Sequence, residues 1–287
     1  MWKSGIIILL SLALIMYSCS DRERIVDQRI LSNYDFRQFQ GTPAWELAKA
    51  VEDGETEKIE IILRENPSLA NFQSPKYGLT VLHLAVSHCN RKSVESLLKS
   101  NIDVNIRGTE KGDTPLNEAC FNNDIELVKL LIEYGADINV KEISDSSHMP
   151  RSPLMSACFV GFEDAAKLLI SKGADINYIM NGDYTALGES LMVGHYKIAY
   201  FLLLHGADYK IPIMRIKKYS KTGKDDVIRS VYIKEEIEEK NINYLTPERK
   251  YYYKIVDFLK EKGIDIKESS EREFHLTEFV KQIIQYI

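Results

Sequence analysis

Apolar and polar positions follow a helical period over most of the chain. Between residues 80 and 210, apolar side chains spaced three and four positions apart form short paired segments, and a polar stretch with glycine or asparagine follows each pair. This spacing predicts amphipathic helices that occur two at a time. Because the pairs recur at a nearly constant interval, the sequence predicts an array of similar units rather than one irregular core.

Two short motifs mark each unit. The opening motif occurs at Thr80–Ala85, Thr114–Ala119, Ser152–Ala157 and Thr185–Ser190. These starts are 34, 38 and 33 residues apart. The closing motif occurs at Asn101–Asn105, Gly135–Asn139, Gly173–Asn177 and Gly206–Lys210. Both motifs keep the same distance from each other, so chance similarity is a poor explanation.

The residue types in the motifs suit the two ends of a helix pair. Thr or Ser at the start caps free backbone N–H groups, and proline at the next position, as in Pro115, fits a first helical turn. Gly135, Gly173 and Gly206 fall where the second helix must end in a left-handed residue, and Asn101 takes that place in the first of these units.

These motifs resemble the ankyrin repeat over residues 77–210. The resemblance implies an all-α ankyrin-repeat solenoid of about six helix-pair units with short β-hairpin tips, in which His83 ties neighbouring turns together and His195 has a structural role. The expected units are 43–75 (the N-terminal cap), 76–109, 110–147, 148–180, 181–210 and a divergent unit at 211–267. Residues 268–287 are expected to form a C-terminal capping helix.

The divergent unit contains an insertion within residues 211–244. Alternating segments at 211–217 and 227–233 flank a polar turn, which predicts a β-hairpin. Residues 234–240 also suit a helix that would supply the first helix of this unit, and both predictions can hold.

The N-terminal residues predict export. Lys3 precedes an apolar run that stops before Ser18 and Cys19. The stretch 15–19 resembles a bacterial lipobox, which implies a signal peptide at 1–18, a lipid on Cys19 and a tether or arm at 19–42. The expected location is a bacterial membrane, and Ser20 favours the outer one.

Composition narrows the function classes. The formal net charge is −5, and lysines and arginines are scattered among acidic residues, so nucleic acid is not an expected partner. Catalytic and metal-binding motifs are missing from the sequence, which predicts no cofactor, no metal and no small-molecule substrate. Cys120 and Cys158 occupy equivalent positions that favour buried thiols, while the sequence leaves the role of Cys89 open.

The candidate binding surface follows from the resemblance, because ankyrin arrays usually meet partners at the tips and along the first helices. Positions seven and eight residues after each opening Thr or Ser should lie there. Phe121, Phe159 and Met192 should stack one per repeat into an exposed apolar stripe, to which the tips add Tyr77 and Tyr184. The remaining candidates are His88, Asn122, Val160 and Val193. Alternatively, the arm or the insertion covers this stripe.

The favoured function is a non-catalytic scaffold that binds a protein partner through the concave ankyrin surface. One alternative is an immunity or inhibitor protein that blocks a secreted toxin or hydrolase. Another is an enzyme of unknown type, in which residues 211–244 form a lid.

Overall fold

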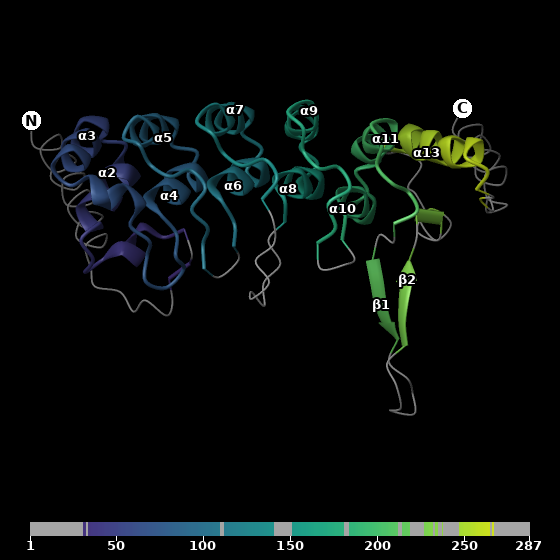
Figure 1. Ribbon diagram of the computed structural model, residues 1–287, viewed down its shortest axis with the longest axis horizontal. Coiled ribbons are helices and arrows are strands. Elements are labelled where there is room, and N and C mark those ends of the chain that lie inside the picture. Colours follow the sequence, from purple (N-terminus) through teal and green to yellow (C-terminus); the bar gives the residue numbers. More distant parts are fainter. Residues whose placement is uncertain are drawn as a thin grey trace, which may run out of the picture. The chain divides into compact units, whose positions relative to one another are not determined.

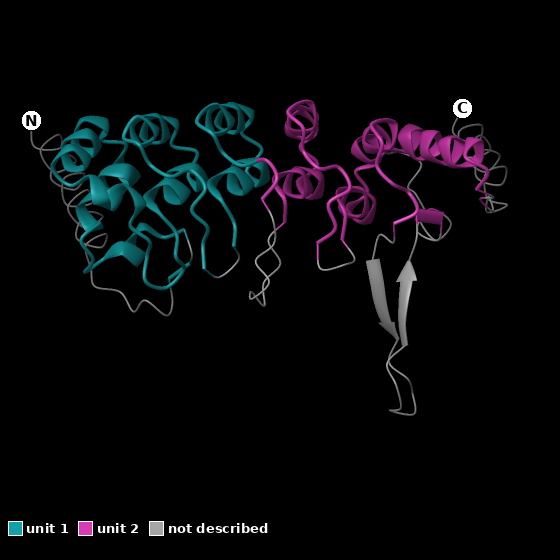
Figure 2. Cartoon of the chain, viewed as in Figure 1, with its two compact units in different colours: residues 1–137, 142–150 teal, residues 138–141, 151–287 magenta. Residues whose placement is uncertain are grey.

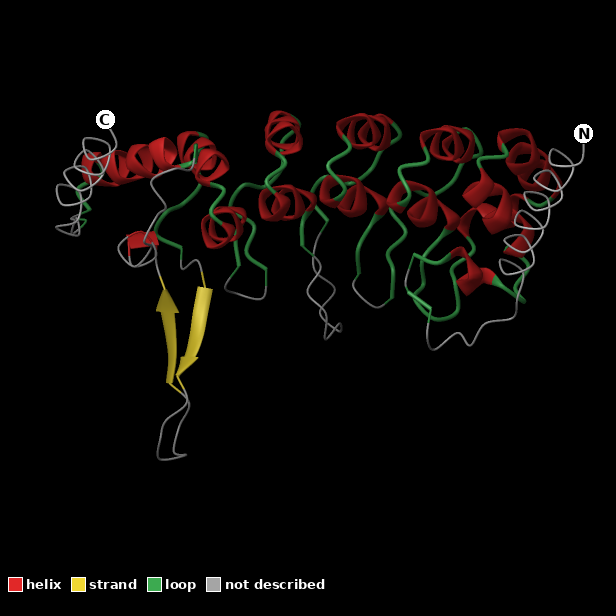
Figure 3. Ribbon diagram, turned by 180° about the vertical axis from the view of Figure 1, so that it is seen from behind, coloured by secondary structure: helices red, strands yellow, loops and turns green. Residues whose placement is uncertain are grey.

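The described part of the chain is helical apart from one two-stranded sheet (Figure 3). The computed structural model describes residues 31–32, 34–109, 112–140, 151–180, 184–211, 214–218, 227–231, 233–234, 237, 247–264 and 266. The expected all-α architecture is confirmed. The signal peptide expected at 1–18, Cys19 and the C-terminal helix expected at 268–287 lie outside the described residues.

Contacts within the chain define two compact units (Figure 2). The first contains residues 1–137 and 142–150, and the second contains 138–141 and 151–287. The first unit holds η1 (Phe36–Phe39), α2 (Trp45–Asp53), α3 (Thr56–Glu65), η2 (Pro67–Asn71), α4 (Val81–Ser87), α5 (Arg91–Leu98), α6 (Pro115–Phe121) and α7 (Ile125–Glu133). The second holds α8 (Pro153–Val160), α9 (Glu163–Ser171), α10 (Ala186–Val193), α11 (Tyr196–Leu204), β1 (Met214–Lys218), β2 (Val227–Val231) and α13 (Arg249–Glu261).

Each unit is built from helix pairs. In the first unit α2, α4 and α6 form one row and α3, α5 and α7 form a second row (Figure 1). We call the first helix of each pair, including α8 and α10, an inner helix, and the second, including α9, α11 and α13, an outer helix. The leucine two residues after the opening Thr or Ser is at most 2% exposed in each of the four repeats that carry the opening motif. These residues are Leu82, Leu116, Leu154 and Leu187.

The opening motif caps the inner helices, as expected. In α4 the Thr80 hydroxyl and backbone N–H both lie close to His83 Nδ1, at 3.0 and 3.1 Å. His83 Nε2 is 3.2 Å from the carbonyl oxygen of Asp113 in the next repeat, which confirms that His83 links neighbouring turns. Burial lowers the pKa of His83 to about 4, so the ring is neutral at pH 7.

The outer helices end where the closing motif places a left-handed residue. Gly135, Gly173 and Gly206 have φ values of 86°, 91° and 95°, and Asn101 has φ 55°. Glycine adopts this conformation without a steric penalty, and asparagine tolerates it better than other residues. The expected helix ends are therefore confirmed.

An asparagine ladder joins successive repeats through the closing motif. In each step the side-chain amide donates to a glycine carbonyl of the next repeat at 3.1 Å, and its oxygen accepts the backbone N–H of the following aspartate at 2.7–2.8 Å. The asparagines are Asn105, Asn139 and Asn177, their glycines Gly135, Gly173 and Gly206, and their aspartates Asp137, Asp175 and Asp208. The ladder ends at Lys210, whose side chain offers no acceptor.

Two further packing expectations are met. Cys120 and Cys158 are buried, and burial raises the pKa of the Cys120 thiol, as expected for an unreactive side chain. A Cβ on Gly161 would lie 2.6 Å from the His195 ring, so His195 packs against the end of the preceding inner helix.

The divergent unit contains the expected hairpin. Strands β1 and β2 pair antiparallel, with Met214 opposite Val231 and Lys218 opposite Val227. Of the helix expected at 234–240, residues 234 and 237 are described and are helical. Ile237 is buried, and its carbonyl accepts the Tyr252 hydroxyl at 2.6 Å. The outer helix α13 then packs on α11 through its apolar face.

Candidate protein-binding surface

The ends of two inner helices carry exposed apolar side chains. Phe121 is the last residue of α6 and is 48% exposed, and Val193 is the last residue of α10 and is 47% exposed. Phe159, Val160 and Met192 are half-buried at the corresponding ends of α8 and α10. These residues lie at the expected positions and retain surface that a partner could contact.

Tyr77 does not lie on an exposed tip, and this expectation was wrong. Its ring is 9% exposed, and its hydroxyl donates to the carbonyl of Leu31 at 2.7 Å. The ammonium of Lys76 also donates to that carbonyl at 3.3 Å and lies over the Tyr77 ring. The arm upstream of the repeats therefore covers Tyr77. Tyr184, by contrast, is half-buried in a β-bridge with Met180.

The arm packs on the inner helices of the first unit. Phe36 in η1 stacks on Trp45 at the start of α2, with ring centroids 5.4 Å apart. The Tyr34 hydroxyl donates to the buried carboxylate of Glu118 in α6. The pKa of Tyr34 is raised, first by burial and then by the Glu118 charge. Of the two expected covers, the arm occupies part of this surface while leaving Phe121 half-exposed; the hairpin side chains lie outside the described residues.

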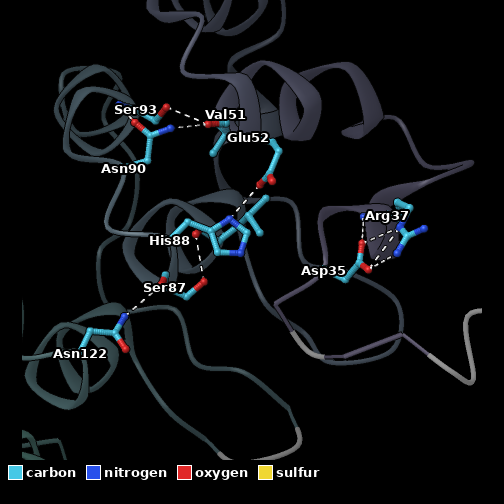
Figure 4. Close-up of polar contacts among 10 residues, drawn as sticks. Asp35, Arg37, Val51, Glu52, Ser87, His88, Asn90, Ser93 and Asn122 are labelled. Carbon is cyan, nitrogen blue, oxygen red and sulfur yellow. Dashed lines mark hydrogen bonds and ion pairs between the residues drawn. The ribbon is translucent and has the colours of Figure 1, made fainter. Parts of the chain in front are cut away.

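An open groove of about 420 Å³ lies between the arm and the inner helices. Its lining residues are Ser32, Tyr34, Asp35, Phe36, Arg37, Glu52 and His88. Figure 4 shows His88 pointing toward Glu52, with Asp35 and Arg37 on the arm segment. The Arg37 guanidinium donates to both Asp35 carboxylate oxygens, and although burial favours a higher value, these bonds lower the pKa of Asp35.

His88 is held by its own chain. Its Nδ1 is 2.8 Å from a carboxylate oxygen of Glu52 in α2. This hydrogen bond raises the pKa of His88 against the opposing effect of burial, and the Glu52 charge and the Tyr34 carbonyl add to the increase. The His88 ring therefore connects Glu52 in α2 to Tyr34 in the arm, and this role lies within the chain.

Asn122 is also engaged within the chain. Its amide donates to the carbonyls of Val86 and Ser87 at 3.3 and 3.2 Å (Figure 4). In the preceding repeat Asn90 similarly donates to Val51. These bonds connect the turn of one helix pair to the inner helix of the previous pair, which leaves the neighbouring aromatic residue as the stronger contact candidate.

The second unit contains a buried carboxylate that the sequence analysis missed. Glu189 in α10 accepts a 2.9 Å bond from Arg151 Nε, and the Arg151 guanidinium lies 4.2 Å from the centre of the Phe159 ring. Glu118 and Glu189 both stand four residues after the opening Thr, at a position otherwise occupied by Leu84 and Ser156. The sequence did contain a signal for these carboxylates, because a glutamate recurs at a position of the opening motif that is buried in every repeat.

Comparisons with known proteins decide the family. A model described as ankyrin repeats, three copies, matches residues 14–108, 47–142 and 143–212. The chain belongs to the ankyrin repeat family. Ankyrin repeats act as protein–protein interaction scaffolds, so the inner-helix ends described above are placed on a fold whose general role is binding.

Curated ankyrin proteins align with this chain over only part of their own length. A fowlpox virus ankyrin repeat protein is 38% identical over 85 residues, which is 29% of this chain and 24% of the viral protein. The B-cell lymphoma 3 protein homolog of Mus musculus is 37% identical over 70 residues, 24% of this chain and 16% of the mouse protein. A Rickettsia felis ankyrin repeat protein is 34% identical over 94 residues, 32% of this chain and 42% of its own length. The chain thus spans less than half of each relative.

Within the described ranges, no three His, Cys, Asp or Glu side chains are grouped so that they could hold a metal ion. The same ranges contain no helix that is long and apolar enough to cross a membrane. Cys89 is exposed to solvent. The pKa of its thiol is nevertheless raised, first by partial desolvation and then by the charges of Asp124 and Glu118.

Proposed function

We propose that this ankyrin repeat protein is a non-catalytic scaffold that binds a protein partner through the ends of its inner helices and is held on a bacterial membrane by a lipid on Cys19. The partner contacts Phe121 in the first unit and Phe159, Met192 and Val193 in the second. The membrane anchor rests on the apolar run before Cys19 and the resemblance of residues 15–19 to a lipobox.

One observation carries the binding proposal. Phe121 and Val193 are each almost half exposed at the ends of equivalent helices in two separate units. Exposed apolar side chains that recur at the ends of equivalent helices in a repeat array mark a contact surface, because exposing each one to water costs free energy that is recovered when a partner covers it.

The arm supports the same surface. The arm lies on the inner helices of the first unit, with the Tyr34 hydroxyl bonded to Glu118 and the Leu31 carbonyl bonded to Tyr77. We infer that the partner binds beside the arm in the first unit and directly on the inner-helix ends in the second.

The test compares capture of envelope proteins by the full chain and by two double variants. The variant Phe121→Asp/Val193→Asp should capture at least about tenfold less partner than the wild type, because two apolar side chains that the partner covers would become charged. Ile61→Asp/Tyr134→Asp is the matched control, because Ile61 in α3 and Tyr134, directly after α7, are 48% and 45% exposed.

Equal capture by the Phe121/Val193 variant and the wild type would reject this surface. Equal loss in both variants would show a general effect of added charge instead of a specific site.

A further inference from the structure

The outer helices of the second unit carry a lysine–aromatic patch, which has no part in the proposed inner-helix site. In α11, Lys197, Tyr200 and Leu204 are spaced three and four positions apart and therefore share one face. In α13, Lys250 and Lys254 are one turn apart and Tyr251 lies beside them. These six residues define the patch.

Contacts bring the two helices' side chains together. The Tyr200 and Tyr251 rings are 6.4 Å apart, and the Lys254 ammonium lies 5.4 Å from both ring centres. The Lys250 and Lys197 ammonium groups lie 5.0 and 6.0 Å from the Tyr251 ring. Three positive charges thus surround one pair of tyrosines.

The positive charge of the patch is only partly compensated. Glu163 in α9 bonds both Lys197 and Lys167, each at 2.5 Å, and although burial favours a higher value, these bonds lower the pKa of Glu163. Within the described residues, Lys250 and Lys254 form no ion pair. The patch is confined to the start of α13, because Asp257 follows one turn after Lys254.

An exposed apolar residue lies one turn after Tyr200 on α11. Leu204 is 56% exposed at the end of α11. The face therefore combines flexible cations, tyrosines with a polar edge and an aliphatic side chain directed away from the core. This combination suits the boundary between water and a bilayer, where lysines meet anionic headgroups and aromatic and aliphatic groups enter the upper acyl region.

We propose that the lysine–aromatic patch binds the surface of a phospholipid bilayer that contains anionic lipids. Lys197, Lys250 and Lys254 contact the headgroups, while Tyr200, Tyr251 and Leu204 enter the interface. A nucleic acid would use the same charges but would gain nothing from Leu204, so the bilayer matches more of the patch. The interaction requires neither a protein partner on the inner helices nor a lipid on Cys19.

The experiment uses residues 19–287 with Cys19→Ser, so that neither the expected signal peptide nor a lipid can enter the bilayer, and measures co-sedimentation with vesicles. Vesicles of phosphatidylcholine alone are compared with vesicles of phosphatidylcholine and phosphatidylglycerol in equal parts. Adding Lys250→Glu/Lys254→Glu should reduce partitioning onto the mixed vesicles by at least about tenfold, because each lysine near an anionic surface contributes severalfold. Added salt should weaken wild-type partitioning.

Lys92→Glu/Lys129→Glu, on α5 and α7 of the first unit, changes the net charge equally and should bind like the wild type. Leu204→Ser leaves every charge in place and should also weaken binding to the mixed vesicles, which provides a test independent of charge reversal. Circular dichroism checks that each variant is folded.

Three results would overturn the proposal. The first is equal partitioning of the wild type onto both kinds of vesicle. The second is equal loss in the Lys92/Lys129 control. The third is tighter binding of a single-stranded DNA through Lys250 and Lys254 than of the mixed vesicles, which would assign the patch to nucleic acid.

Discussion

Two residues of different chemistry, His83 and Asn117, occupy the same place in successive repeats. Each is the third residue of its inner helix and receives a hydrogen bond from the capping threonine, Thr80 or Thr114. His83 additionally reaches Asp113 in the next repeat. The other two repeats have Met155 and Gly188 at this position, so the side-chain acceptor is a feature of these two repeats alone, and of the pair only the histidine is titratable.

Replacing His83 with Asn should flatten the pH dependence of folding stability. Because the folded pKa is about 4 and the unfolded value about 6.5, the unfolded chain takes up the proton first as the pH falls. The stability that neutral His83 provides is present above pH 6.5 and is lost between about pH 6.5 and 4, by about 3 kcal/mol.

Urea unfolding of the wild type and of His83→Asn across this range measures the difference. The variant should lose about 1 kcal/mol at pH 7, because the bond to Asp113 is missing, and should then lose less on acidification. Parallel pH profiles would show that the imidazole is not buried in its neutral form. The raised pKa of His88 acts in the opposite direction but is common to both proteins.

Residue-level prediction succeeded where the motif dictates geometry. The capping threonines and the left-handed glycines follow from local backbone chemistry within a single repeat, whereas the His83 link to the next repeat was implied by the resemblance to ankyrin repeats. The exposure of Tyr77 was predicted wrongly, because it depends on Leu31, which is 46 residues away in sequence. The role of Glu118 was missed for the same reason, since its partner Tyr34 lies outside the repeats.

At the scale of elements, the asparagine ladder connects one closing motif to the next. Its geometry repeats with little variation across three steps, although the intervening loops differ in length. The ladder lies at the outer-helix ends, where glycine carbonyls would otherwise face water without a protein partner. It therefore fixes the spacing of neighbouring repeats independently of the tips.

Asn105→Ala should reduce the free energy of unfolding by about 1–2 kcal/mol, because two hydrogen bonds between repeats are lost at an exposed position. Chemical denaturation monitored by circular dichroism gives the value. Lys210→Ala is the matched control, since it occupies the same motif position and makes no ladder bond; it should stay within about 0.5 kcal/mol. A similar loss in both variants would contradict the ladder.

The hairpin and the outer helix α13 were predicted from alternation and from the second-helix pattern. The inner part of the divergent unit was harder, because a polar segment of mixed pattern fits both strand and helix. Two described residues, Ile233 and Ile237, show that buried apolar positions with helical spacing were the informative feature.

For the whole molecule, the repeat pattern predicted the family and the fold class but not the partner. A scaffold surface is shared by ankyrin proteins with different partners, and the relatives are matched over less than half of their lengths. The identity of what binds depends on a few exposed side chains that the fold does not constrain.

The proposed anchor gives a prediction at this scale. Cys19→Ser should allow the mature protein to be extracted from bacterial membranes by high salt that leaves the wild type bound, because salt weakens the lysine–aromatic patch but does not release acyl chains. Cys89→Ser, which removes an exposed thiol, should leave the distribution unchanged. Fractionation and the mass of the N-terminal peptide measure the result; an unmodified Cys19 in the mature protein would exclude the anchor.

The asparagine ladder also bears on how such a chain can change in length. Each asparagine bonds the equivalent glycine carbonyl and aspartate N–H of the next repeat. If residues 140–177 were removed, Asn139 could therefore bond Gly206 and Asp208, which are the partners of Asn177. Recombination between the codons of two ladder asparagines would join equivalent positions and leave no asparagine side chain without its hydrogen-bond partners. Gain or loss of whole repeats is thus the mildest large rearrangement open to this gene.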